Sequence, residues 1–423
     1  MIRVFLLLRQ NEIGKEIMKK TLIFIIAVFL LLLARSSFAA RIMNSNVSVR
    51  TMPNAFYPVL AILSKGAEVE ILQEEDRWKK IKTADNKIGW ISANAFNSIK
   101  KSIDYGAMSN DNSKKNISKL MVTAAVKGFF ESKATSSDIN RDVFEKPFRQ
   151  YIDPSMFNKF KKQTYDQRWS HKKFRGKNKI EQKGAFTIDE NLVALSSYIA
   201  AKFSAPGLSQ NLELVVYVNN VAQLIIESTE FYDLPISVLV VKSDEVLANA
   251  TPIGVIVISE GFLKIIKDES ELACLLGHEI AHVTLNHGST EFEIRKPKFA
   301  ADDAFAELEK ELGVDEVETE LDDLCDEMYE RAVGGRKAEY EEKADHRGMI
   351  YARRAGYSAN GMLSLLKRLK SRVPVSREPT DASHWLPVSM QKRITKLENI
   401  TATKLKPNKH YLTFQSRYKA QRK

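Results

Sequence analysis

Cysteine is nearly absent from this chain of 423 residues, which contains only two. Two thiols cannot build a disulfide-stapled scaffold or supply a metal centre held by four thiolates. The sequence also lacks any RNA- or DNA-binding signature, so its net charge of +11 does not by itself indicate a nucleic-acid partner. What remains is a composition of 44% hydrophobic and 28% charged residues, which is typical of a globular protein.

The N-terminal region lacks the run of about 20 apolar residues that a membrane-spanning helix needs. Leu22–Ala34 is apolar but has 13 residues, follows Lys19-Lys20 and precedes the small residues Ser37 and Ala39. This layout is typical of a cleaved secretory signal, which we assign to residues 1–39. We therefore expect an exported protein, in the periplasm or secreted, with no transmembrane segment in the mature chain. The alternative is a segment that is retained as a membrane anchor.

Residues 41–100 contain short runs of alternating apolar and polar residues separated by turns, as half-buried strands do. About 55 residues of short strands suit a small closed barrel. The order of Val49-Arg50, Lys65-Gly66, Trp78 and Gly89-Trp90-Ile91 resembles that of bacterial SH3-like domains. The resemblance implies that the domain binds cell wall or another protein. The two tryptophans either line a ligand groove or pack in the core.

Several later stretches are rich in charges of one sign. Residues 101–185 are interpreted as a linker with helical and basic segments, and Lys159–Lys183 contains ten basic and two acidic residues. Such a run could bind nucleic acid or anionic lipid, but no amphipathic apolar face accompanies it, so a solvated linker is favoured. Residues 401–423 are interpreted as a basic C-terminal tail. The acidic stretch 302–330 is expected to be a solvated helical insertion, unless it docks onto the basic linker.

Residues 186–400 are predicted to form one mainly helical domain with a small sheet. Ile236–Val241 and Gly254–Ile258 are β-branched runs of strand length. Ser270 is the predicted N-cap of the helix that follows it. Apolar spacing predicts helices over residues 192–203, 215–229, 270–286, 321–332, 337–355 and 360–369. The predicted fold is thus multidomain, with a small all-β SH3-like barrel followed by an α+β, mainly helical domain.

The helix predicted over residues 270–286 contains the sequence His278-Glu279-Ile280-Ala281-His282 in apolar surroundings. Residues four apart lie only about 40° apart around a helix, so both imidazoles point the same way and can bind one metal ion. Glu279 lies beside them, where it can accept a proton from a metal-bound water. Three buried polar side chains without partners would cost about 1–3 kcal/mol each, which disfavours a purely structural role.

Two histidines leave a third metal ligand to be found. His287 is five residues after His282, and continued helical geometry would turn it about 140° away, so we do not expect it to be a ligand. Glu341 is the preferred ligand, because Asp345 lies one turn later on the same face, where it could accept a hydrogen bond from a ligand imidazole, and the small Ala344 allows close approach to the histidine helix. Glu318 begins a pair with the same spacing and is the alternative.

These motifs occur in the order seen in a known family. The segments concerned are Ala250-Thr251-Pro252, Gly254–Ile258, His278–His282, Glu341 and Ala344-Asp345. They resemble the HtpX-like and CAAX-prenyl-protease-like zinc metallopeptidases, a gluzincin family with soluble envelope members, and the similarity covers about residues 190–400. The resemblance implies one Zn²⁺ per chain, bound by His278, His282 and Glu341, with Glu279 as the general base.

The function implied by this resemblance is that of an exported zinc metalloendopeptidase acting on unfolded or misassembled envelope proteins. The run 254–258 is expected at the cleft edge, where an extended substrate could pair with it. His384 stands in His384-Trp385-Leu386-Pro387, where family members tend to have His-Pro. It is a candidate for substrate contact, oxyanion stabilisation or gating. The alternatives are an envelope chaperone or assembly factor with a gated or silent site, and a cell-wall hydrolase.

Two further sequence features have alternative interpretations. Met18 would be a more ordinary start than Met1, because it directly precedes the basic and apolar parts of the signal. Cys274 and Cys325 could pair in an oxidising compartment, or Cys274 could be a buried core residue.

Overall fold

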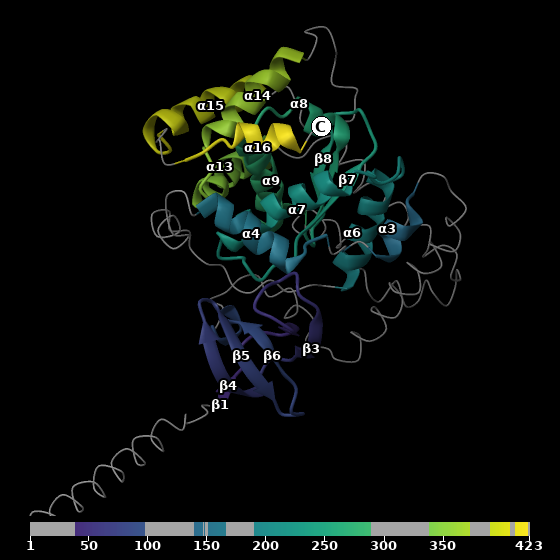
Figure 1. Cartoon of the computed structure of the whole chain (residues 1–423), viewed down its shortest axis with the longest axis vertical. Helices are drawn as coiled ribbons and strands as arrows, with labels where there is room; N and C mark the ends of the chain where they lie inside the picture. Colours follow the sequence, from purple (N-terminus) through teal and green to yellow (C-terminus); the bar gives the residue numbers. More distant parts are fainter. Residues whose placement is uncertain are drawn as a thin grey trace, which may run out of the picture.

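The computed structural model describes residues 39–97, 139–146, 148, 151–165, 190–288, 338–372, 390–406 and 411–421. An all-β domain and a mainly helical domain with a small sheet lie against each other (Figure 1), which confirms the predicted fold class. None of the helices in these ranges combines the length and the apolar character needed to cross a bilayer. Outside the described residues lie residues 1–38 of the predicted signal peptide, the acidic stretch 302–330, Glu318, Cys325 and His384, whereas the last residue of the predicted signal, Ala39, is described.

The N-terminal domain is a six-stranded sheet in the order β1-β4-β5-β6-β2-β3. Its elements are β1 (Ala39–Arg41), β2 (Val47–Arg50), β3 (Val59–Leu63), β4 (Glu68–Glu75), β5 (Trp78–Thr83), β6 (Ile88–Ser92) and the 3₁₀ helix η1 (Ala93–Phe96). Every pairing is antiparallel. Alternate residues, among them Val49, Val69, Ile81 and Ile91, form its core. Between β5 and β6 the chain reverses at Asn86, whose φ of 64° is a left-handed conformation that asparagine tolerates.

The helical domain is built around one long buried helix, α9, which packs against α7, α13 and α14. The helices are α3 (Arg141–Glu145), α4 (Pro154–Tyr165), α6 (Glu190–Phe203), α7 (Leu212–Glu227), α8 (Glu260–Ile265), α9 (Glu269–Thr284), α13 (Ala338–Arg354), α14 (Asn360–Arg372), α15 (Met390–Thr403) and α16 (Gln415–Ala420). The small sheet contains β7 (Ser237–Val241), β8 (Ala248–Ala250) and β9 (Val255–Ser259). Every residue of α9 is buried, so its polar side chains face protein on all sides.

The order of the small sheet corrects one expectation. The strands run β7-β9-β8, with β7 parallel and β8 antiparallel to β9. The prediction that the run 254–258 forms the cleft edge is wrong, because β9 is the central strand and is paired on both sides. Its five residues are all buried, which explains its continuous β-branched sequence. Among the described strands the short β8 is the last in this order, and it contacts α9.

Both ends of α9 differ from the prediction by about two residues. The N-cap is Asp268 rather than Ser270, and its carboxylate accepts a hydrogen bond from the Glu271 backbone amide at 3.1 Å. The helix ends at Thr284, and Asn286 then takes a left-handed conformation with a φ of 57°. This reversal decides where the residues after it lie.

Helices α9 and α13 approach each other closely at two glycines. A Cβ on Gly277 would lie 2.7 Å from the carbonyl oxygen of Gly348, and a Cβ on Gly348 would lie 2.5 Å from the backbone nitrogen of His278. Real Cβ atoms do not approach backbone atoms so closely, so only glycine fits at either position. The close packing brings the first turns of α13 against the histidine face of α9.

Two of the basic stretches contribute packed helices. Helix α4 lies within the stretch interpreted as a linker, and its Phe157 and Phe160 are buried in the main core. Helix α16 lies within the stretch interpreted as a basic tail. From it, Arg417 pairs with the buried carboxylate of Glu269 in the first turn of α9, which also accepts hydrogen bonds from two tyrosines. The C-terminal segment therefore helps to anchor the helix that carries the histidines.

Candidate metal centre

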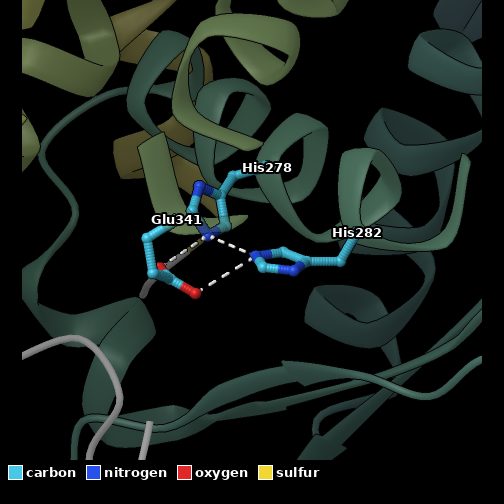
Figure 2. Close-up of side chains that lie close together, drawn as sticks. All are labelled: His278, His282 and Glu341. Carbon is cyan, nitrogen blue, oxygen red and sulfur yellow. Dashed lines mark hydrogen bonds and ion pairs between the residues drawn. The ribbon is translucent and has the colours of Figure 1, made fainter. Parts of the chain in front are cut away.

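Three buried side chains converge between α9 and α13 (Figure 2). The Nε2 atoms of His278 and His282 lie 3.0 Å apart, one helical turn from each other on the same face of α9. The carboxylate of Glu341, from the first turn of α13, faces both rings. Its two oxygens lie 3.3 Å from Nε2 of His278 and 3.4 Å from Nε2 of His282. The structure thus brings together the three residues predicted as metal ligands.

This donor set fits a divalent metal. Two imidazole nitrogens and one carboxylate oxygen lie within 4.8 Å of one another, and each side chain is at most 2% exposed. Among the described residues, no other group of histidine, cysteine, aspartate or glutamate is arranged to hold a metal. Three protein ligands with a position left for water are the arrangement of catalytic zinc sites.

On one side of the centre, charged groups hold His278. Its Nδ1 atom lies 2.9 Å from Asp345, and Arg393 of α15 donates two hydrogen bonds of 2.7 Å to the same carboxylate. When Nδ1 donates its proton to Asp345, the lone pair of Nε2 faces the other ligands, so the carboxylate selects the tautomer that binds metal. Arg393 also lies 3.3 Å from Glu341.

On the other side, a third histidine holds His282. The Nδ1 atoms of His287 and His282 lie 3.0 Å apart, and the His287 ring stacks on Tyr340 at 4.2 Å between centroids. The prediction placed His287 on another face because it extended α9 past its real end. Since the helix ends at Thr284, the left-handed turn brings His287 back against the outer nitrogen of His282. His287 lies outside the group of three described side chains that could hold a metal.

The charges at the centre perturb one another. Burial lowers the pKa of His278, but the carboxylates of Asp345 and Glu341 outweigh burial and raise it to about 9. Burial raises the pKa of Glu341, yet the adjacent His282 and His278 hold it well below its usual value. An ionised carboxylate between two imidazoles favours positive charge at the point where the three side chains meet.

The remaining predicted residue of the motif, Glu279, is fully buried on α9 next to the first histidine. Burial lowers the pKa of Arg393, but Asp345, Glu341 and Glu279 raise it above its ordinary value, so the guanidinium stays charged. Sequence reasoning missed Arg393. A signal for it exists, because Arg393 interrupts the buried apolar face of α15 between Met390 and Ile394.

The cysteine of α9 takes no part in the centre. The Cys274 thiol is fully buried and directed toward the carbonyl oxygens of Ser358 and Ala359, at 3.6 and 3.7 Å. Burial raises its pKa, so it stays protonated at neutral pH.

A helix presenting two histidines and a glutamate, completed by a carboxylate from a second helix, defines a metallopeptidase type of centre. Comparison with known proteins agrees: residues 214–401 match the sequence model of peptidase family M48, and residues 45–96 match that of the bacterial SH3 domain. The chain therefore contains a peptidase family M48 domain preceded by a bacterial SH3 domain, which confirms the resemblance drawn from the motifs.

A curated protein of Vibrio cholerae named "Putative beta-barrel assembly-enhancing protease" is 24% identical over 195 residues. The alignment covers 46% of this chain and 40% of the relative. The chain thus matches about two fifths of the length of that protein.

Proposed function

We propose that this chain is an exported, zinc-dependent metalloendopeptidase that hydrolyses peptide bonds of unfolded or misassembled envelope proteins. The observation that carries the proposal is the convergence of His278, His282 and Glu341 at one buried point beside Glu279. The apolar segment at residues 22–34 and the name of the Vibrio cholerae relative support a place in the envelope.

Each residue of the centre has a role in the proposed reaction. When bound, zinc supplies a Lewis acid that polarises the scissile carbonyl and lowers the pKa of its water ligand to about 7. Glu279 accepts a proton from the attacking water while the water oxygen bonds to the carbonyl carbon. The same carboxylate then delivers the proton to the leaving amine nitrogen as the C–N bond breaks. Asp345 orients His278 throughout.

Strand β8 contacts α9, so a substrate that reaches the small sheet would lie near the centre. A chain already folded into its own sheet or helix cannot present an extended backbone there. That requirement favours unfolded or misassembled chains over compact ones.

The test is cleavage of unfolded casein by the purified mature protein. We expect cleavage to stop when a chelator removes the metal and to return when zinc is added. Glu279→Gln should keep zinc and lower cleavage by roughly 10²–10⁴-fold, because it removes the base but preserves size. Glu245→Gln, at an exposed position, is the matched control and should cleave as the wild type does. Full activity of Glu279→Gln would exclude the proposed hydrolase.

A further inference from the structure

The SH3 domain has an aromatic face that is covered by the helical domain. Trp78 of β5 and Trp90 of β6 are only 8% and 7% exposed, and they cluster with Tyr232 from the loop between α7 and β7. The rings of Trp78 and Tyr232 meet edge to face, with centroids 5.7 Å apart. A tyrosine placed this way occupies the surface on which an SH3-type aromatic groove would receive a ligand.

Polar contacts around Tyr232 fix its orientation. Its hydroxyl donates to the Arg77 carbonyl at 2.8 Å and accepts from the Ser92 hydroxyl at 2.8 Å. The guanidinium of Arg77 lies 3.9 Å above the ring centroid. Hydrogen bonds thus fix the hydroxyl of Tyr232, while Arg77 covers the face of its ring and Trp78 meets the ring edge to face.

The SH3 domain also binds the backbone that leads to Tyr232. Arg77 donates to the carbonyl oxygens of Thr229, at 2.5 Å, and of Glu227, at the C-terminal end of α7. A cation at this end of a helix satisfies carbonyls that have no partner within the helix and complements the helix dipole. Asn94 donates at 3.2 Å to both the carbonyl of Glu230 and the carboxylate of Asp233.

A third group of contacts extends the interface along α7. Asn54 of the SH3 domain donates to the carboxylate of Glu227 and accepts from the Gln223 side chain at 3.0 Å. The other oxygen of Glu227 pairs with Lys161 of α4 at 2.8 Å. Asn54, Gln223 and Glu227 are all buried, so these bonds are shielded from water.

We propose that the aromatic face of this SH3 domain is a receptor for the peptidase domain of the same chain, with residues 227–233 as its ligand. The face is filled by a buried aromatic ring and surrounded by matched donors and acceptors, which is the anatomy of a specific interface. A cell-wall peptide or a separate protein cannot use this face while the segment is docked. The proposal concerns docking and does not depend on the proposed catalysis.

The docked segment is joined to the helices of the metal centre. Glu230 forms a two-pronged ion pair with Arg354 at the end of α13, with distances of 2.7 and 2.8 Å. On the same helix, the hydroxyl of Tyr351 lies 2.9 Å from the hydroxyl of Thr284, the last residue of α9. The SH3 domain thus supports, through residues 227–233, the helix that carries Glu341.

The test uses the full chain with a recognition sequence for a specific protease inserted within residues 98–138. After cleavage of the folded protein, we expect the two pieces to elute together in gel filtration. Arg77→Ala removes the cation over the ring, and Tyr232→Phe removes only the hydroxyl. We expect the combined variant to associate about 10- to 100-fold more weakly. Arg41→Ala, which alters an exposed arginine of the same domain, is the matched control and should leave co-elution unchanged.

Circular dichroism before cleavage verifies that each variant is folded, and both substitutions were chosen to preserve the core. Separation of the wild-type pieces would overturn the proposal, as would tight association of the combined variant. Purified peptidoglycan sacculi provide a second probe. The intact wild-type chain should not be retained on them through this face, so retention that Arg77→Ala abolishes would show that the face binds cell wall instead.

Discussion

The two histidines of the metal centre are supported in opposite ways. His278 relies on a carboxylate from α13 and an arginine from α15, both of which are charged and buried. His282 relies on His287, which follows it in the same chain segment and stacks on Tyr340. Distant charged residues support one imidazole, and a local ring supports the other.

The difference shows what each kind of support requires. A buried ion pair such as Asp345 with Arg393 repays its desolvation only when geometry and hydrogen bonding are complete, so it depends on the packing of three helices. The support from His287 depends mainly on the left-handed turn at Asn286. We therefore expect damage on the His278 side to affect both metal binding and folding, and damage on the His282 side to affect metal binding alone.

The largest effect on metal content should come from Glu341→Ala, which removes the ligand shared by both sides. Zinc content and casein cleavage should fall together, because two imidazoles cannot neutralise the dication. Glu342→Ala is the matched control, since that neighbouring carboxylate pairs with Lys392 and Lys396 instead. Metal analysis of both variants decides the point. A full equivalent of zinc in Glu341→Ala would mean that the third ligand is a different carboxylate.

On the His278 side, the largest loss of folding stability should come from Arg393→Met. This change leaves Asp345 and Glu341 buried without their cation, and breaking such a pair costs about 3–5 kcal/mol of folding free energy. Urea unfolding of the metal-free protein measures the loss. Arg353→Met, on the outer side of α13, should change the free energy of unfolding by less than about 1 kcal/mol. Equal effects of the two substitutions would contradict a special role for the buried pair.

Asp345→Asn should have an intermediate effect. The amide keeps the size of the side chain but no longer fixes the His278 tautomer by charge, so zinc affinity should fall about 10–100-fold. Competition with a fluorescent chelator measures that affinity. If affinity stays at the wild-type value, Asp345 serves folding and not the metal.

The smallest effect should come from His287→Gln, which replaces one hydrogen-bonding partner of His282 with another. Zinc affinity should fall by about 10-fold, which is the lower end of the range of about 10–100-fold for groups that orient a metal ligand. The free energy of unfolding should hardly change. His346→Gln, on α13 away from the metal centre, should leave zinc affinity unchanged. If His287→Gln lowered zinc affinity as much as Asp345→Asn does, the proposed difference between the two sides would be wrong.

Much of the centre could be predicted from residue spacing. The pair His278 and His282 needs only a helix to converge, because residues four apart share a helix face. The same rule places Glu341 and Asp345 on one face of α13, while the pair that begins at Glu318 has the same spacing. These inferences succeed because they depend on local geometry that any regular helix supplies.

Other features could not be predicted because they depend on where helices end and on which strands pair. Helical spacing gave the wrong position for His287 because α9 ends at Thr284, before that residue. The central position of β9 depends on how all three strands of the sheet pair. The pattern of Trp78 and Trp90 left groove and core as alternatives. The structure shows both rings buried against Tyr232, more than 140 residues later in the chain.

The sequence by itself determined which residues form the candidate metal centre, the helices that carry them and the presence of a small β domain in front. The tertiary structure alone decided which groups support those residues: Arg393 for His278, His287 for His282 and the SH3 domain for the segment after α7. The physical reason is range. Helical periodicity acts over a few residues, whereas a buried charge or an aromatic ring finds its partner only when distant segments have packed together.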